Sequence, residues 1–148
     1  MKMKTGIINP IIFPMLLLCL HLSAAGQSKT VVKEQITGIF WQVVSFEDTI
    51  PSRASGQKMG ITLMNNNKMS GFALCNNISG TYSLKPARGI LHFKNMNMTW
   101  RGCAGAVRAE YHFLNALKIT THYRLSKDTL VLYAGNRRMM SLLKQQGQ

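Results

Sequence analysis

The sequence has 148 residues, with 18 Lys or Arg against 5 Asp or Glu, so its formal net charge at pH 7 is +13. This length fits one domain with a single core, and it excludes a two-domain nucleotide-dependent enzyme and a large barrel enzyme. The hydrophobic fraction of 46% is too high for a disordered chain, and the charged fraction of 16% lies below the ~25% of an average globular domain. We therefore expect a folded, basic domain, whose composition does not by itself indicate an activity.

Residues 1–26 have the three parts of an export signal: two early lysines, an apolar stretch and a run of small residues. The small residues predict cleavage after Gly26, with Ala25 as the alternative position. Two prolines interrupt the apolar stretch, which is shorter than the ~20 residues that a membrane-spanning helix needs. The sequence therefore predicts a protein exported to the periplasm or cell envelope rather than one that keeps an anchor.

Cys19 allows a second interpretation, in which a lipidated cysteine tethers the protein to a membrane. Leu18 argues against it, because lipoprotein signals usually carry Gly, Ala or Ser directly before the cysteine. Beyond the signal we expect a linker over residues 27–37 and one domain over residues 38–145. No further hydrophobic run approaches the length of a membrane span.

The exported part of the chain remains strongly basic. In the envelope, the abundant anions are lipid head groups, lipopolysaccharide and acidic polysaccharide, and a positive field concentrates them near the surface. Nucleic acid would be the expected partner of a cytoplasmic protein of this charge, and export argues against it.

Removal of the signal leaves two cysteines, Cys75 and Cys103. In an oxidising compartment such a pair favours a disulfide, which in a loop of this length contributes about 3 to 4 kcal/mol. Free buried thiols are one alternative. A zinc site with His92 and His112 is another, but no two of these four residues have the close spacing of structural zinc ligands.

The pattern along the chain predicts a mainly β domain with one helix. Aromatic and β-branched runs separated by turn-forming residues indicate strands, and Asn65–Lys68 and Lys85–Gly89 are expected to be hairpin turns. Residues 104–118 change to helical periodicity, with Val107, Tyr111, Leu114 and Leu117 on the predicted buried face. The predicted strands are 39–46, 61–64, 70–74, 80–84, 90–93, 122–125, 129–133 and 138–143.

Four segments carry a resemblance to a known family. Gly71–Tyr82 resembles the G-x-x-x-C-N-x-x-x-G-x-Y core of the META domain, or HslJ-like, family. Thr99–Cys103 is similar to the T-x-x-x-C element of that family, Glu110–Leu117 to its E-x-x-F-L-x-A-L helix, and Gly38–Trp41 to its opening G-x-x-W strand.

This resemblance implies a small, incompletely closed antiparallel β-barrel with one helix inserted around residues 104–118. It also implies an exported or surface-linked bacterial protein that is heat-inducible or connected with motility and virulence, from a family with no established enzymatic activity. Structural roles follow from residue chemistry: the glycines permit close approach of strands, Asn76 binds backbone groups, and the Tyr82 hydroxyl reaches a polar partner. The motif residues to which we assign structural roles are Gly71, Asn76, Gly80, Tyr82, Thr99 and Glu110.

A soft-metal site is a weaker possibility. If the segment stays extended, His92, Met96, Met98 and Trp100 share one face, and thioethers bind Cu(I) and Ag(I). The favoured interpretation is that Met96 and Met98 fill the core beside Trp100. We therefore predict no metal and no other cofactor.

The sequence contains no pattern typical of a catalytic site. Of the five acidic residues only Glu47 and Asp48 are adjacent, and neighbouring strand residues point to opposite faces. We expect a non-enzymatic, monomeric envelope protein, linked to stress, that presents an apolar groove or sheet edge to another envelope protein or a ligand. The alternatives are a periplasmic copper or silver protein, and a protein that binds anionic lipid or lipopolysaccharide through Arg137, Arg138 and the scattered basic residues.

Overall fold

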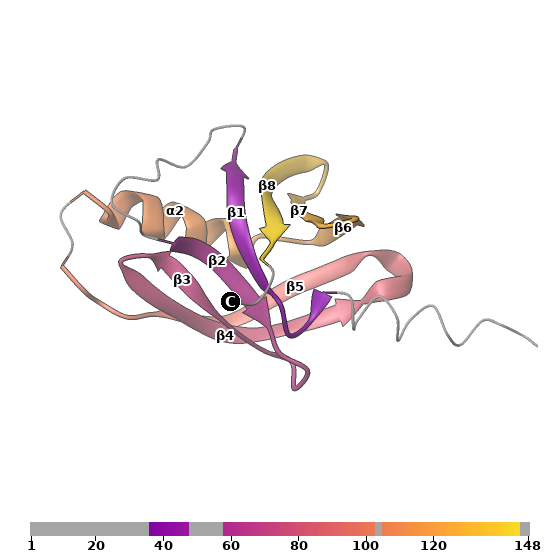
Figure 1. Ribbon diagram of the computed structural model, residues 1–148, viewed down its shortest axis with the longest axis horizontal. Coiled ribbons are helices and arrows are strands. Elements are labelled where there is room, and N and C mark those ends of the chain that lie inside the picture. Colours follow the sequence, from indigo (N-terminus) through magenta and orange to yellow (C-terminus); the bar gives the residue numbers. More distant parts are fainter. Residues whose placement is uncertain (1–35, 48–57, 103–104, 146–148) are drawn as a thin grey trace, which may run out of the picture.

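The computed structural model describes residues 36–47, 58–102 and 105–145 (Figure 1). The predicted export signal with Cys19, most of the predicted linker, and Cys103 lie outside the described residues. The described residues form eight strands, one α-helix and a 3₁₀ turn, as predicted for a mainly β domain. These are β1 (Phe40–Phe46), β2 (Lys58–Leu63), β3 (Lys68–Leu74), β4 (Asn76–Lys85), η3 (Pro86–Arg88), β5 (Ile90–Met98), α2 (Val107–Lys118), β6 (His122–Ser126), β7 (Thr129–Ala134) and β8 (Arg137–Lys144).

The strands follow one another in sequence order, all antiparallel, and β1 pairs with β8 to close them into a ring. The narrowest join is between β5 and β6, where Ile90 and His122 form the one registered pair. Helix α2 is inserted between these two strands and packs against β5 and β3 (Figure 1). The single predicted helix therefore lies against β5, one of the two strands that form the narrowest join.

The core is formed by the residues of each strand that point into the ring. Trp41 is fully buried there, and its indole Nε1–H donates a hydrogen bond of 2.9 Å to the carbonyl oxygen of Ile36. Ile36 is itself fully buried and Thr37 bridges to Leu63. The packed domain therefore includes at least two residues that we assigned to the linker before Gly38.

The predicted hairpins are confirmed, but β4 and β5 are longer than expected. Asn67, with a φ of +62°, lies in the β2–β3 turn, and Gly89, also at +62°, ends the 3₁₀ turn between β4 and β5. β4 begins at Asn76 and β5 continues to Met98, where it pairs with Ile78. The extension was missed because a shift of register next to Gly80 interrupts the alternation of buried and exposed residues.

The predicted buried face of the helix is only half correct. Leu114 and Leu117 are buried, but Val107 and Tyr111 are 39% and 43% exposed. The buried face also contains Glu110, Phe113 and Ala116. The observed buried face is therefore rotated about the helix axis relative to the face that the apolar spacing predicted. The physical reason is that Phe113 offers a larger apolar surface than Val107, while the Glu110 carboxylate has hydrogen-bond partners in the interior.

Gly71 permits β2 and β3 to approach closely, as the sequence predicted. A Cβ atom at this position would overlap the backbone oxygen of Gly60. We expect Gly71→Ala to lower the free energy of unfolding by about 1 to 3 kcal/mol, because the paired backbones would have to separate. Urea denaturation measures the change.

Gly102→Ala is the matched control for Gly71→Ala. A Cβ atom there would meet nothing within 4 Å, and the residue is exposed. Its expected effect is within about 0.5 kcal/mol. Equal stabilities of the two variants would contradict the steric role of Gly71.

Candidate functional site

A buried carboxylate joins α2 to the beginning of β4. Glu110 is fully buried, and its Oε1 accepts hydrogen bonds from the backbone N–H groups of Cys75, at 2.9 Å, and Asn76, at 2.8 Å. Its Oε2 accepts a third bond, of 2.8 Å, from the Asn76 side-chain amide. Leu74, with a φ of +60°, precedes these donors, and a left-handed residue at this place helps to direct successive N–H groups at one anion. The sequence analysis assigned Glu110 a structural role as a motif residue, and the structure adds its three specific donors.

Asn76 extends this network to the end of β5. Its side-chain oxygen accepts hydrogen bonds from the Thr99 hydroxyl, at 3.0 Å, and from the Arg101 backbone N–H, at 2.7 Å. The Thr99 hydroxyl in turn accepts a bond from the Asn77 backbone N–H. The structure thus brings together three of the motif residues, Asn76, Thr99 and Glu110, which lie in three separate segments of the sequence.

The network makes a specific prediction for Glu110→Gln. The amide oxygen of Gln could still accept the two backbone N–H groups, but its NH₂ group would face the NH₂ group of Asn76. Because two donors would then meet without an acceptor, we expect a loss of about 1 to 3 kcal/mol of unfolding free energy. Thermal and urea denaturation measure it.

Glu47→Gln removes the same charge from an exposed ion pair with Arg137, in which the N–O distance is 3.6 Å. We expect this control to cost between about 0 and 1 kcal/mol. A Glu110→Gln protein as stable as the Glu47→Gln protein would show that the network does not hold α2 in place.

Tyr82 fulfils its predicted structural role. Its ring is buried, and its hydroxyl donates a hydrogen bond of 2.6 Å to the backbone oxygen of Met64. Burial raises the pKa of the Tyr82 phenol above its ordinary value of about 10, so this side chain is neutral at physiological pH. Gly80 also permits the expected close approach, because a Cβ atom there would lie 2.6 Å from the Met96 sulfur.

The candidate soft-metal residues do not share one face, so the structure contradicts the condition on which this weaker possibility depended. Asn95 has a φ of +50°, and the register of β5 with β4 shifts beside it. This bulge inverts the alternation: Met96 and Met98 pack against the core, while the His92 Nδ1 forms a hydrogen bond of 3.1 Å with the Thr120 carbonyl. Within the described ranges, no three His, Cys, Asp or Glu side chains lie together as a group that could hold a metal ion.

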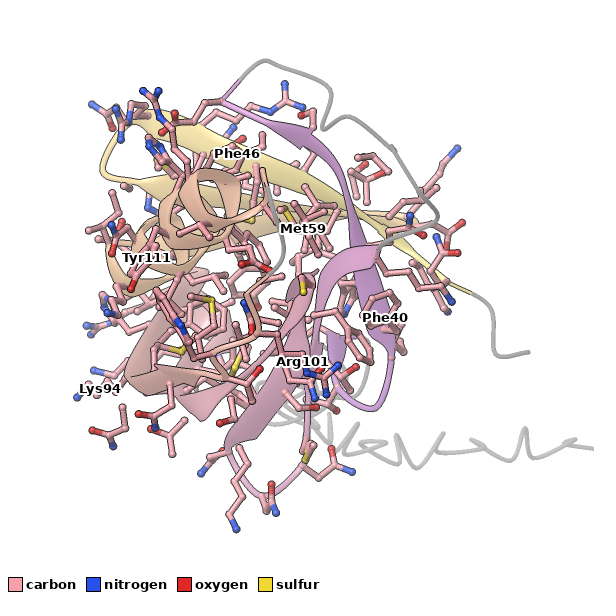
Figure 2. The ribbon with its side chains drawn as sticks, turned by 90° about the vertical axis from the view of Figure 1, so that its left-hand side faces the viewer. Phe40, Phe46, Met59, Lys94, Arg101 and Tyr111 are labelled. Atoms are coloured by element: carbon pink, nitrogen blue, oxygen red, sulfur yellow. The ribbon has the colours of Figure 1, made fainter. Side chains whose placement is uncertain are left out.

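An exposed surface forms where the chain leaves β5 and where α2 begins. Trp100 is 71% exposed, and its ring meets that of Tyr111 edge to face, with centroids 6.3 Å apart. Val107 and Arg108 lie about one helical turn before Tyr111, Arg101 follows Trp100 in the chain, and all three of these residues are exposed. We call Trp100, Arg101, Val107, Arg108 and Tyr111 the aromatic–basic surface. Tyr111 lies at the left margin of Figure 2, and Lys94 of β5 lies at the same margin.

The exposed charges described on the elements that carry this surface are positive. The described residues include three carboxylates, of which Glu110 is buried in the network and Glu47 pairs with Arg137. The third, Asp128, lies in the turn between β6 and β7. No exposed carboxylate therefore belongs to β5, to residues 99–102 or to α2, as far as the structure describes them.

Another exposed aromatic pair has a structural explanation. Phe72, which is 47% exposed, meets Phe40 edge to face at 6.0 Å. A Cβ atom at Gly60 would lie 2.7 Å from the tip of the Phe40 ring, so this ring covers a glycine on the outer side of the sheet. This pair stabilises the strands that it covers.

The predicted anion-binding pair Arg137 and Arg138 already has partners within the protein. Arg137 forms the ion pair with Glu47, and Arg138 donates a hydrogen bond to the Ser141 hydroxyl. Sequence reasoning identified the basic character of the chain but not its location, because only folding brings residues 99–101 next to the first turn of α2.

Comparisons with known proteins address the fold. The META domain family model matches residues 34–147. A protein from Burkholderia xenovorans, solved by NMR, is similar with a TM-score of 0.63 and 19% identity over 99% of both chains. A crystal structure of a DUF4847 family protein from Bacteroides vulgatus is similar with a TM-score of 0.57 and 15% identity, covering 79% of this chain and 99% of that one.

A second NMR structure has a TM-score of 0.59 and 21% identity, covering 74% of this chain and 92% of that chain. At these identities the similarities establish the fold alone. No curated protein matches the chain. The structure describes no helix that is both long enough and apolar enough to cross a membrane.

Proposed function

Because the chain belongs to the META domain family, we propose that it is a non-enzymatic binding module of the bacterial cell envelope that engages its partner through the aromatic–basic surface. The observation that carries this proposal is the exposure of the Trp100–Tyr111 pair. Tryptophan, tyrosine and arginine are the residues that most often dominate binding energy. Here Trp100 contacts Tyr111, Arg101 follows Trp100 in the chain, and Arg108 lies three residues before Tyr111 on the helix.

The contrast between the two tryptophans supports a binding role for Trp100. Trp41 is fully buried and hydrogen-bonded, so its contribution to the core explains its presence in the fold. Trp100 leaves 71% of its surface in water, where a large apolar ring contributes little to folding. Its partner Tyr111 is also exposed, so the pair forms an apolar feature that is available to another molecule.

We place the contact on these side chains rather than on an apolar groove or sheet edge. The described strands close into a ring. Helix α2 packs against β5, which forms the narrowest join of the ring with β6. The non-enzymatic assignment rests on the buried network, in which both oxygens of the Glu110 carboxylate accept hydrogen bonds from the protein's own groups. We do not extend the proposal to soft metals, because the bulge in β5 separates the candidate ligands.

Export and a Cys75–Cys103 disulfide are parts of the same proposal. The Arg101 backbone N–H binds the side chain of Asn76, which directly follows Cys75. This bond places Arg101, two residues before Cys103, beside Asn76, the residue after Cys75. An oxidising compartment would then favour a bond between the two sulfurs.

We expect Cys75 and Cys103 to resist alkylation in protein taken from its host without reductant, and both to react after reduction. Cys75→Ser should lower the unfolding free energy by about 3 to 4 kcal/mol, because the unfolded chain gains freedom. Mass spectrometry and urea denaturation measure the two effects. Free thiols in the untreated protein would contradict the disulfide, and Cys19, if retained, serves as an internal reactive control.

Site-specific crosslinking in cells tests the binding function. A photoreactive phenylalanine analogue at position 100 should form adducts with a partner, because it keeps an aromatic ring on the proposed contact surface. The matched control is the same analogue at position 72, an exposed ring with a structural role. Gel shifts and mass spectrometry of the adducts are the measurements, and absence of any adduct at position 100 would remove this function.

A further inference from the structure

We infer that the partner of the aromatic–basic surface is the interface of a lipid bilayer that carries anionic phosphate head groups. This inference rests on the proposed binding function and specifies its partner. It is carried by the chemistry of Trp100 and Tyr111, by the positive charges on the elements that carry them and by the exposure of both rings.

The two rings have the chemistry that suits a membrane–water interface. Trp and Tyr combine a large apolar body with one polar group, and they are enriched at the level of the lipid head groups. Trp100 and Tyr111 present this combination together, since their ring centroids are 6.3 Å apart. Val107, 39% exposed and one helical turn away, adds aliphatic surface on the same side of α2.

The charges beside the rings select an anionic surface. Arg101 follows Trp100 directly, and Arg108 lies three residues before Tyr111 on the helix. Lys94 of β5 and Lys118 at the end of α2 are also exposed on the two elements that carry this surface. Because the described part of these elements has no exposed carboxylate, the field that an approaching membrane meets is positive throughout.

The exposure of the two rings suits a bilayer. Trp100 and Tyr111 are 71% and 43% exposed. The soft head-group region of a bilayer can accept projecting rings without a matching cavity.

The expected contact is peripheral and reversible. Two rings and a valine bury little apolar area, so the attraction between arginines and anionic head groups must supply much of the binding. In the bound protein the segment at residues 99–101 and the first turns of α2 face the bilayer, and the ring of strands lies behind them.

The full chain is tested on vesicles of equal parts phosphatidylglycerol and phosphatidylcholine, with vesicles of phosphatidylcholine alone as the neutral comparison. Brominated lipid quenches only tryptophan that enters the interface. Since Trp41 is fully buried, quenching reports Trp100. We expect quenching and a blue shift of emission on the anionic vesicles alone, and both should disappear in Trp100→Phe, which retains Trp41.

The charge contribution is measured with two matched double variants. Arg101→Gln with Arg108→Gln should weaken partitioning about 25-fold, on the basis of about fivefold for each charge near an anionic surface. Lys68→Gln with Lys127→Gln removes the same charge from two exposed positions, the first residue of β3 and the β6–β7 turn, and should weaken partitioning less than about twofold. The Arg101 backbone N–H stays in place in the first variant, so its bond to Asn76 is retained. Near-ultraviolet circular dichroism checks that both variants are folded.

Three results would overturn the inference: no quenching of Trp100 on anionic vesicles, equal weakening in the two double variants, or binding that does not respond to salt. All variants contain residues 1–26, so differences between them do not arise from that segment. If position 100 crosslinks to a protein in cells while vesicle binding is absent, the binding function stands and the lipid partner is excluded.

Discussion

The hydrogen bonds between the Glu110 carboxylate and the Cys75–Asn76 segment are the interaction on which the arrangement of this protein depends. A fully buried carboxylate is stable only when its lost hydration is replaced, and here three N–H groups replace it. The same contact attaches α2 to the beginning of β4. Strand β4 pairs with β5, which forms the narrowest join of the ring with β6. The polar network and the apolar face of the helix therefore act together to fix the position of α2.

The position of α2 in turn creates the proposed binding surface. Tyr111 directly follows Glu110, about 100° further around the helix. A helix held with Glu110 inward therefore leaves Tyr111 beside the buried face, where it is 43% exposed. On the strand side, the Asn76 side chain binds the Arg101 backbone and so fixes the segment that carries Trp100. One buried network thus positions both aromatic rings of the surface, although none of its polar atoms belongs to either ring.

Sequence reasoning was most accurate where local pattern and tertiary environment agree. The turns at Asn65–Lys68 and Lys85–Gly89 and the three C-terminal strands were predicted, because turn residues and alternation describe an antiparallel hairpin directly. It failed at the bulge in β5, where the left-handed conformation of Asn95 inverts which side chains face the core. It also failed on the helix face, because apolar spacing takes no account of a buried charged residue with partners in another segment.

The amino-acid sequence by itself determined the family, the antiparallel succession of strands and the place of the helix, because each depends on short-range patterns and motif residues. Tertiary structure decided that Glu110 faces inward, that Met96 and Met98 pack against the core and that Trp100 stands beside Tyr111 in water. The physical reason is that these outcomes depend on hydrogen bonds and register between separate segments of the chain, such as Asn76 with Arg101, Glu110 with Cys75 and β4 with β5. No local pattern encodes which donor a buried carboxylate will meet.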